Sequence, residues 1–245
     1  MLLKLDNPKL LADTISLISE LVLEVKAKVT KQGLEIIAVD PANAALVSLK
    51  FPSSTFSQFE IDKEEELGLN LEDFKQVLRR VSGSTSLIIE RHDNTLRLKV
   101  QEKAKRVFNF SLINIDAEEK KIPQLNFSSK VELDSGTFSE LINDAVVVSD
   151  SAEFFVTPNS FIIEARGTLN NTRAEFSSDE IKIDTKEESK SKYGTDYLAK
   201  FVKASKLSDK VVINFSNNYP VRFDFKNKEN LFELSFILAP RGEEE

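Results

Sequence analysis

Side chains able to do acid–base or metal chemistry are few and scattered in this sequence. The single histidine, His92, lies in the run 91–95 between two strand-like segments, where a hairpin turn is expected. The 40 Asp and Glu residues could supply a glycosidase-type pair of carboxylates. They are spread along polar stretches, however, and none lies in an apolar segment that would raise its pKa. We therefore interpret His92 as a surface turn residue, and a carboxylate-dependent hydrolase stays open as an alternative function.

The composition excludes most other catalytic classes. The 245 residues contain no Cys and one His, which excludes disulfides, thiol nucleophiles, thiolate metal sites and any site built on two imidazoles. The seven glycines are too scattered for a phosphate-binding loop. Two acidic runs, 64–66 and 243–245, are interpreted as solubilising charge. We expect neither a cofactor nor a metal, and the protein is predicted not to be an enzyme.

The cations are arranged in a more informative way. The chain is acidic overall, with 33 Lys and Arg against 40 Asp and Glu and a formal net charge of -7. Two segments, 71–82 and 193–205, carry apolar residues at helical spacing. Opposite these apolar stripes or on their flanks lie Lys75, Arg79 and Arg80 in the first segment and Lys200 and Lys203 in the second. A solvated helix face is one interpretation, but two matched basic faces in an acidic protein also indicate a nucleic-acid contact.

These two segments occupy equivalent positions in an internal duplication. Asp73 and Phe74 align with Asp196 and Tyr197 at an offset of about 123 residues, and further matches recur at about 127. Ahead of each set lies another predicted helix, 8–22 and 137–148. Each half therefore predicts helix, strands, helix and strands.

Residues typical of helix starts support these four helices. Asn70 is predicted to cap the helix over 71–82, and Pro8 suits the first position of the helix over 8–22. Ser135 or Thr137 is predicted to cap the helix over 137–148.

The expected fold class is α+β, with two similar domains of helices and antiparallel sheet. We place the N-terminal domain at 1–113, an interdomain connector at 114–128 and the C-terminal domain at 129–245, because the connector is polar and lacks periodicity. The Lys-, Glu- and Ser-rich segment 184–192 is predicted to be a mobile loop.

The ends and the hydropathy of the chain indicate an intracellular protein. Asp6 interrupts the N-terminal segment before the apolar core of a signal peptide could form. No apolar run approaches the roughly 18 residues that cross a bilayer. We expect a cytoplasmic or nucleoid-associated protein without a membrane partner.

Several segments point to one family when they are taken together. They are AVDPANAALV at 38–47, FPSSTF at 51–56, LGLNL at 67–71, IP at 122–123, SKYGTDYL at 191–198 and LAPR at 238–241. In number and order they resemble segments of the proliferating cell nuclear antigen (PCNA) family, the DNA sliding clamps of archaea and eukaryotes. The resemblance is to the archaeal type. The resemblance covers essentially the whole chain in register, and none of the motifs is catalytic.

The resemblance implies a subunit of a closed trimeric ring around duplex DNA, with helices lining the hole and sheets outside. It implies a processivity factor that tethers DNA polymerase, flap endonuclease and DNA ligase and is placed by a clamp loader. The contact with DNA would not depend on base sequence. A homotrimer and a heterotrimer both stay open, and a checkpoint-type clamp subunit is the nearest alternative.

The resemblance also implies three sets of site residues. The DNA-facing set is Lys9, Lys75, Arg79, Arg80, Lys200 and Lys203. The pocket for partner peptides is formed by Val39, Asn43, Ile122, Pro123, Phe127, Pro220, Ile237 and Ala239. The subunit interface, made by edge strands at 105–112 and 172–178, includes Val107, Phe108, Phe110, Arg173 and Glu175.

Two features depart from the family pattern. The first helix of each domain usually offers cations to the hole, but here the helix over 8–22 has only Lys9 and the helix over 137–148 has none. We therefore expect a weakly positive lining, which favours a hetero-oligomer with more basic subunits. The second departure is the pair Lys120 and Lys121, since at least the first of these positions is often apolar in relatives. We therefore predict that the range of partner peptides bound at the pocket is narrowed or shifted.

Overall fold

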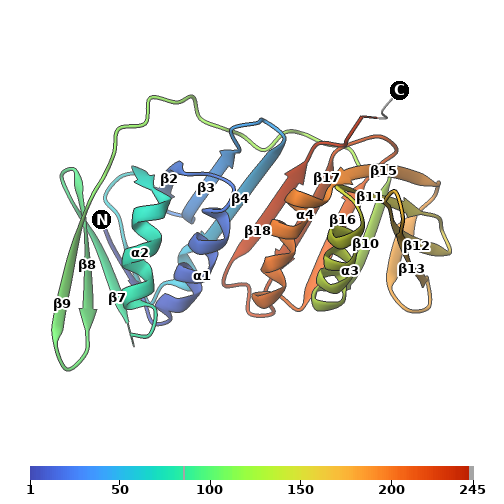
Figure 1. The fold of residues 1–245 in the computed structure, drawn as a ribbon. Coiled ribbons are helices and arrows are strands. Elements are labelled where there is room, and N and C mark those ends of the chain that lie inside the picture. Colours follow the sequence, from blue (N-terminus) through green and yellow to red (C-terminus); the bar gives the residue numbers. More distant parts are fainter. Residues whose placement is uncertain (85, 243–245) are drawn as a thin grey trace. The chain divides into compact units, whose positions relative to one another are not determined.

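The computed structural model describes residues 1–84 and 86–242 and divides them into two compact units (Figure 1). Unit 1 comprises Met1–Pro41 and Val47–Ile122, and unit 2 comprises Ala42–Leu46 and the residues from Pro123 onward. The acidic run 243–245 lies outside the described residues. The domain limits at 113 and 128 stay a prediction, and the boundary between the units at Ile122 and Pro123 falls between them.

Unit 1 alternates helices with two antiparallel sheets. Its elements are β1 (Leu2–Leu5), α1 (Pro8–Ile18), β2 (Glu24–Thr30), β3 (Gly33–Val39), β4 (Ala45–Pro52), the 3₁₀ turn η1 (Ser53–Thr55), β5 (Gln58–Glu60), β6 (Glu65–Asn70), α2 (Leu71–Val81), β7 (Leu87–His92), β8 (Thr95–Gln101) and β9 (Lys105–Ser111). One sheet has the strand order β5-β1-β7-β8-β9 and the other contains β4-β3-β2-β6.

Unit 2 repeats this plan. Its elements are β10 (Ser129–Asp134), α3 (Ser135–Val148), β11 (Ser151–Val156), β12 (Ser160–Arg166), β13 (Asn171–Ser177), β14 (Lys182–Thr185), β15 (Ser189–Gly194), α4 (Thr195–Phe201), the 3₁₀ turn η2 (Val202–Lys206), β16 (Lys210–Phe215), β17 (Val221–Lys226) and β18 (Glu233–Leu238). Its strand orders are β14-β10-β16-β17-β18 and β13-β12-β11-β15.

The two strand orders correspond position by position between the units, and α1 and α2 correspond to α3 and α4. The predicted duplication and the α+β fold class are therefore confirmed. Within unit 1, α1 and α2 lie side by side, and within unit 2, α3 lies beside α4 (Figure 1).

The helix starts of unit 1 follow the predicted signals. Pro8 opens α1, where its missing N–H costs no hydrogen bond. The side chain of Asn70 caps α2 by accepting a hydrogen bond from the backbone N–H of Asp73 at 3.1 Å. The apolar stripe of α2 is buried, which leaves its polar face outward.

The predicted cap of α3 was wrong by one residue. Asp134 is the N-cap, and its carboxylate accepts hydrogen bonds from the backbone N–H and the hydroxyl of Thr137 at 2.7 and 2.8 Å. Ser135 is the first helical residue, and its buried hydroxyl donates to the carbonyl of Ser208. Asp134 takes the N-cap position instead of Ser135 because its carboxylate accepts hydrogen bonds from two donors at once.

The helix predicted over 193–205 is shorter than expected. Tyr193 belongs to β15, where it pairs with Ala152 and its buried hydroxyl donates to the carbonyl of Tyr219 at 2.7 Å. Burial raises the pKa of this phenol well above its usual range. The α-helix runs only from Thr195 to Phe201 and then tightens into the 3₁₀ turn η2.

The mobile loop predicted over 184–192 was also wrong. Most of the segment lies in β14 and β15, and only Lys186–Glu188 connects them. Along β15 the buried positions are Ser189, Ser191 and Tyr193, so the strand alternates small polar residues with lysines. The Ser189 hydroxyl is satisfied by those of Ser128 and Ser129, at 2.9 and 3.0 Å. Buried serines hide the hydrophobic alternation that usually reveals a strand.

The core of unit 2 is aromatic. Phe154 lies within 6.3 Å, between ring centroids, of each of five other aromatic rings. Phe201 stacks on Phe236 at 4.4 Å, which holds α4 against the sheet. Each fully buried Phe contributes roughly 1.5–3 kcal/mol through burial alone. The core therefore fixes α4, which carries the predicted DNA-facing Lys200 and leads into the turn with Lys203.

The connector has neither helix nor strand, as predicted. Residues 112–127 are irregular, and their start is pinned where the backbone N–H of Ile113 donates to the carbonyl of Gly68 at 3.0 Å. Among the described residues, the helices are all too short or too polar to span a bilayer.

Candidate DNA interface, partner pocket and subunit edges

The last turn of α2 carries the most open cations of the predicted DNA-facing set. Arg79 and Arg80 are exposed, and neither forms an ion pair with another described residue. Lys75 differs, because its side chain is only 14% exposed and its ammonium lies 2.6 Å from the carboxylate of Glu72. That hydrogen bond holds the pKa of Glu72 below its usual value. Lys75 is thus less exposed than Arg79 and is paired with an acid of its own helix, and its contact with DNA stays a prediction.

The other predicted DNA-facing cations are spread over α1, α4 and η2. Lys9 is exposed and forms an ion pair with Asp13, one turn further along α1. Lys200 is half-buried, with its ammonium 5.6 Å from the ring centroid of Tyr197. Lys203 is exposed in the 3₁₀ turn.

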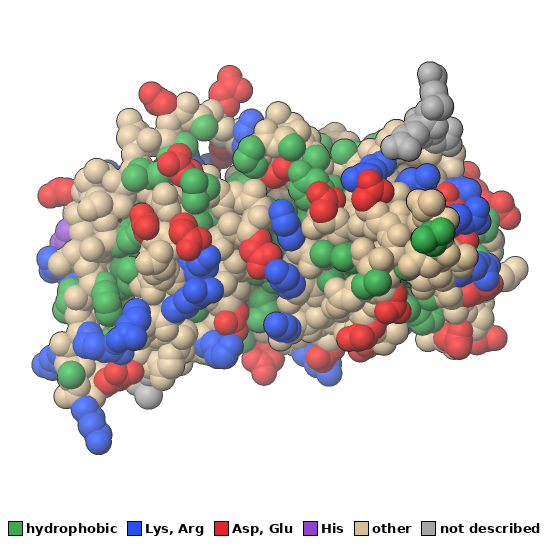
Figure 2. Space-filling model, viewed as in Figure 1, with side chains coloured by type: hydrophobic (Ala, Val, Ile, Leu, Met, Phe, Trp, Pro, Cys, Tyr) green, Lys and Arg blue, Asp and Glu red, His purple; other side chains and the backbone are tan. Residues whose placement is uncertain are grey.

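Further cations, which the sequence reasoning did not include, extend this basic surface. Lys and Arg side chains gather over the end of α2 and the β8–β9 hairpin, at the lower left of Figure 2. Lys103 and Lys105 are exposed at the hairpin tip, and Arg106 donates a hydrogen bond to the carbonyl of Arg80 at 3.3 Å. The lysine-rich run 99–106 was the sequence signal for this patch.

The outward face of α3 carries no cation. Glu140 and Asn143 are exposed on it, and Val147 is 81% exposed. The sequence therefore identified the departure from a basic first helix correctly for unit 2. A half-exposed Val146 beside Val147 makes the end of this helix apolar.

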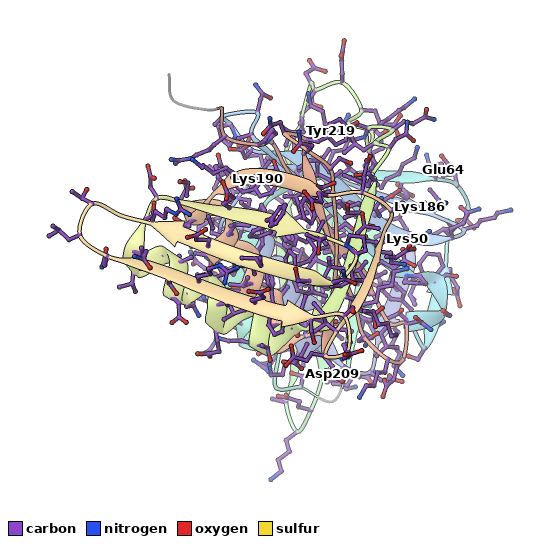
Figure 3. The ribbon with its side chains drawn as sticks, turned by 90° about the vertical axis from the view of Figure 1, so that its right-hand side faces the viewer. Lys50, Glu64, Lys186, Lys190, Asp209 and Tyr219 are labelled. Atoms are coloured by element: carbon purple, nitrogen blue, oxygen red, sulfur yellow. The ribbon has the colours of Figure 1, made fainter. Side chains whose placement is uncertain are left out.

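Most of the predicted partner-pocket residues belong to unit 2. A cavity of about 330 Å³ is lined by residues 123–127, Arg222 and Ile237. The ring of Phe127 packs edge-on against Tyr219, which precedes Pro220 and is labelled in Figure 3. Ile237 is buried at the wall of this cavity, and Arg222 contributes a cation to its lining.

The residue that follows β18 is held by a backbone hydrogen bond. Ala239 follows β18, and its backbone N–H donates to the carbonyl of Ala44 at 2.9 Å. Asn43, next to Ala44, has a left-handed backbone with φ 55°. Asn accepts this conformation more readily than most residues.

Two predicted pocket residues belong to unit 1. Val39 ends β3 and lines a separate cavity of about 220 Å³, together with residues of β2 and the connector. Ile122 is the last residue of the unit, and its side chain is 36% exposed. Lys120 and Lys121, just before it, are both exposed.

The predicted edge strands lie at the ends of their sheets. β9 closes one sheet of unit 1, and β13 closes one sheet of unit 2. Val107 on β9 is 52% exposed, while Arg173 and Glu175 on β13 pair with each other at 2.8 Å. Phe108, on the same strand as Val107, is half-buried beneath Arg106.

Phe110 was placed at the interface, and its side chain is found in the core instead. It is 8% exposed and packs against Phe74 of α2 at 5.3 Å between ring centroids. Along β9, residues 105–109 alternate between exposed and half-buried, and Phe110 begins the covered end of the strand.

The residues proposed for acid–base chemistry do not form a site in the described part of the chain. His92 lies at the β7–β8 hairpin as predicted, half-exposed and 3.2 Å from the carboxylate of Glu90. No group of three potential metal ligands was found among the described residues. The expectation that every carboxylate is solvated was wrong for Asp40. This residue, which follows β3 and precedes β4 in the sequence, is buried.

Comparison with known proteins identifies the class to which this fold and these surfaces belong. Residues 1–121 match the family model for the N-terminal domain of proliferating cell nuclear antigen, and residues 121–241 match the model for its C-terminal domain. The chain belongs to the proliferating cell nuclear antigen family.

Individual relatives agree with this assignment over nearly the whole chain. Proteins named DNA polymerase sliding clamp from Thermococcus fumicolans and Pyrococcus furiosus are 36% and 33% identical to it, covering 98% of this chain and 97% of each relative. A crystal structure of PCNA from Thermococcus kodakaraensis superposes with a TM-score of 0.90 at 26% identity, covering 98% of this chain and 99% of that one. PCNA from Entamoeba histolytica has the same fold, with a TM-score of 0.91 and 22% identity.

Proposed function

We propose that this chain is one subunit of a ring that encircles duplex DNA and acts as the processivity factor of a DNA polymerase. Full-length membership of the sliding-clamp family is the observation that carries the proposal. A tether of this kind needs no nucleophile, metal or proton donor, which agrees with a sequence lacking Cys and holding one His.

The DNA contact is proposed to be electrostatic. Arg79 and Arg80, which form no ion pair with a described residue, would attract phosphates most strongly, and the attraction would be increased by Lys9, Lys75, Lys200 and Lys203. Phosphate contacts carry no sequence information, so the ring would slide rather than stop at a preferred site. The acidic net charge of -7 would oppose adsorption of the outer surface to DNA.

Partner enzymes are proposed to dock by a short peptide with an apolar anchor. The cavity of about 330 Å³ lined by Pro123, Phe127 and Ile237 would take such a side chain. DNA polymerase, flap endonuclease, DNA ligase and the clamp loader are the proposed users of this site. The protein would therefore be intracellular and DNA-associated.

Lys120 and Lys121 are proposed to narrow the choice of partner peptide. Both are exposed directly before the pocket residues, so they favour peptides with acidic flanks. Peptides with acidic and with basic flanks are expected to differ in Kd, and the difference should shrink at high salt. Equal affinities for the two peptides would contradict this role.

The small number of cations on the helices that would line the hole of the ring favours a heterotrimer. The outward face of α3 contributes an acid and exposed valines instead of cations. We expect light scattering to show a stable trimer only when the chain is mixed with a more basic paralogue. A homotrimer held on circular DNA as tightly as more basic clamps would refute the heterotrimer.

A loading experiment tests the ring itself. The chain, alone or with paralogues, is loaded by the clamp loader onto a nicked circular plasmid, which is then linearised. Retention on the circle with loss after linearisation is expected, because a ring can leave only over an end. Equal retention on both forms would refute encirclement. Stimulation of long DNA synthesis by a polymerase then separates a replicative clamp from a checkpoint-type subunit.

A further inference from the structure

The first half of the connector lies beside the sheet of unit 1 without backbone pairing. After the Ile113–Gly68 hydrogen bond, residues 114–127 form no backbone–backbone hydrogen bond with other described residues. Fixing such a segment costs conformational entropy at every residue. Some other contact must therefore hold it in one place.

Two lysines of β2 supply that contact. The ammonium of Lys26 donates a hydrogen bond to the carbonyl of Ala117 at 3.3 Å, and the ammonium of Lys28 donates to the carboxylate of Glu119 at 3.1 Å. Lys26 and Lys28 are two residues apart on the outward face of β2. Their partners are also two residues apart, so an extended connector matches the two-residue repeat of the strand.

A cavity lies beneath this crossing. The cavity has a volume of about 220 Å³. It is lined by residues of β2, by Ile37 and Val39 of β3, and by connector residues that include Ile115 and Ala117. The connector reaches the sheet through these two long lysine side chains, and Ile115 also lies close to Gly68 of β6. Lys26 and Lys28 therefore supply polar contacts that hold this part of the connector at the sheet.

Both contacts involve a charged ammonium and are open to solvent, and the one between Lys28 and Glu119 is an ion pair. Lys26 also lies 3.5 Å from Glu66 on β6, so one lysine joins the connector to two strands. The hydrogen bond and charge of Glu119 raise the pKa of Lys28, and Lys28 lowers the pKa of Glu119. Both groups therefore stay charged at neutral pH, and salt is the condition that weakens them.

We propose that Lys26 and Lys28 are positioning residues that strap the first half of the connector to β2, and that this strap sets the affinity of the partner pocket. The connector continues directly from the strapped residues into the pocket residues Pro123 and Phe127. A strapped connector presents these residues in one arrangement, so a partner peptide orders less chain when it binds. The second part of the proposal rests on the proposed function.

Motion of the connector tests the strap directly. Because the chain has no Cys, Asp116→Cys gives a single site for a nitroxide label on an exposed connector residue. In Lys26→Gln/Lys28→Gln and in Glu119→Gln, the label is expected to tumble at least about twofold faster. Lys28→Arg keeps the charge and the donor and should leave the spectrum unchanged. Lys182→Gln, which breaks a surface ion pair with Glu132 in unit 2 at a similar distance, is the control.

Salt gives a second arm without any substitution in the strap. In 1 M NaCl, where the Debye length is about 3 Å, the label on the otherwise unchanged chain should approach the mobility seen in the double variant. An identical spectrum in all variants, at low and high salt, would overturn the strap.

Peptide binding tests the positioning role. The probe is a fluorescein-labelled synthetic peptide with the short clamp-binding motif of a family DNA polymerase. Its Kd is expected to rise about three- to tenfold in Lys26→Gln/Lys28→Gln and to stay unchanged in Lys28→Arg and Lys182→Gln. A mobile label with an unchanged Kd would overturn the positioning role. If the unaltered chain does not bind the peptide, the proposed pocket fails, whereas the label still decides whether the strap exists.

Discussion

At the scale of single residues, Gly68 decides how the connector leaves unit 1. A Cβ atom at this position would lie 1.9 Å from the carbonyl oxygen of Ile113, which is backbone and cannot rotate away. Glycine is therefore required by close approach, and the Ile113–Gly68 hydrogen bond exploits that approach.

Gly68→Ala is expected to destabilise the protein by roughly 1–3 kcal/mol, because the added methyl group must push the connector or β6 aside. Urea unfolding followed by circular dichroism measures the change. Gly83→Ala is the matched control, because a Cβ atom there meets nothing within 4 Å and Ala favours ordered backbone. Equal stability of the two variants would contradict the close approach.

Asp134 is a second position where one side chain determines local structure. Its carboxylate caps α3, and the hydrogen bond from the backbone N–H of Thr137 lowers its pKa. A carboxylate with a lowered pKa in the folded state stabilises that state above its unfolded pKa of about 3.9. The contribution disappears as pH falls through the lowered folded value.

Asp134→Ala is expected to cost about 0.5–2 kcal/mol near pH 7, and less as the pH falls below about 4. Unfolding in urea at several pH values measures both effects. Asp134→Asn should retain most of the stability at neutral pH, since Asn also caps helices well. A cost for Asp134→Ala that stays constant down to about pH 2 would contradict the charged cap.

At the scale of elements, the edges of β9 and β13 are the predicted surfaces for association with another subunit. An exposed edge strand invites pairing with another chain, and natural proteins rarely leave one uncovered without a reason. Val107 adds an exposed apolar side chain to the edge at β9. We attribute both to association of subunits in the proposed ring.

Val107→Glu is expected to shift the assembled protein towards monomers, because it places a charge in the proposed contact between strands. Multi-angle light scattering, performed with whichever paralogue supports assembly, measures the mass. Leu23→Glu is the matched control, since Leu23 is similarly exposed and precedes β2, outside both edge strands. A mass unaffected by Val107→Glu would refute this placement of the interface.

At the scale of the whole molecule, charge is segregated rather than evenly spread. An acidic chain with a net charge of -7 keeps Arg79 and Arg80 exposed and without ion pairs among the described residues. Arg166, by contrast, is exposed but paired with Glu164 of its own sheet at 2.8 Å. We therefore expect the two arginines of α2 to contribute to the electrostatic part of the proposed DNA contact.

Arg79→Ala/Arg80→Ala is expected to weaken retention on nicked circular DNA. The slope of log K against log salt should become smaller by roughly 0.9 for each phosphate that the protein no longer neutralises. Fluorescence anisotropy over a salt series measures the slope, and light scattering checks that assembly is unchanged. Arg166→Ala should leave the slope as it was. A slope that does not respond to the α2 substitutions would remove these arginines from the proposed DNA-binding surface.

The sequence by itself determined the features that depend on periodicity and order. The apolar stripes predicted α1 and α2 with their starts at Pro8 and Asn70, and the matched halves predicted the duplicated α+β fold. The family resemblance rested on motifs along the whole chain, and the matching family models confirm it. Local signals sufficed here because helix periodicity and turn residues report on the nearest few positions.

Only the tertiary structure decided which side chains face outward and which contacts hold the connector. Phe110 enters the core against Phe74, and buried serines make β15 a strand. The strap from Lys26 and Lys28 joins residues 91 positions apart in the sequence, so no local pattern could reveal it. The physical reason is that ion pairs, burial and sheet edges are set by neighbours in space, whereas the sequence shows directly only neighbours along the chain.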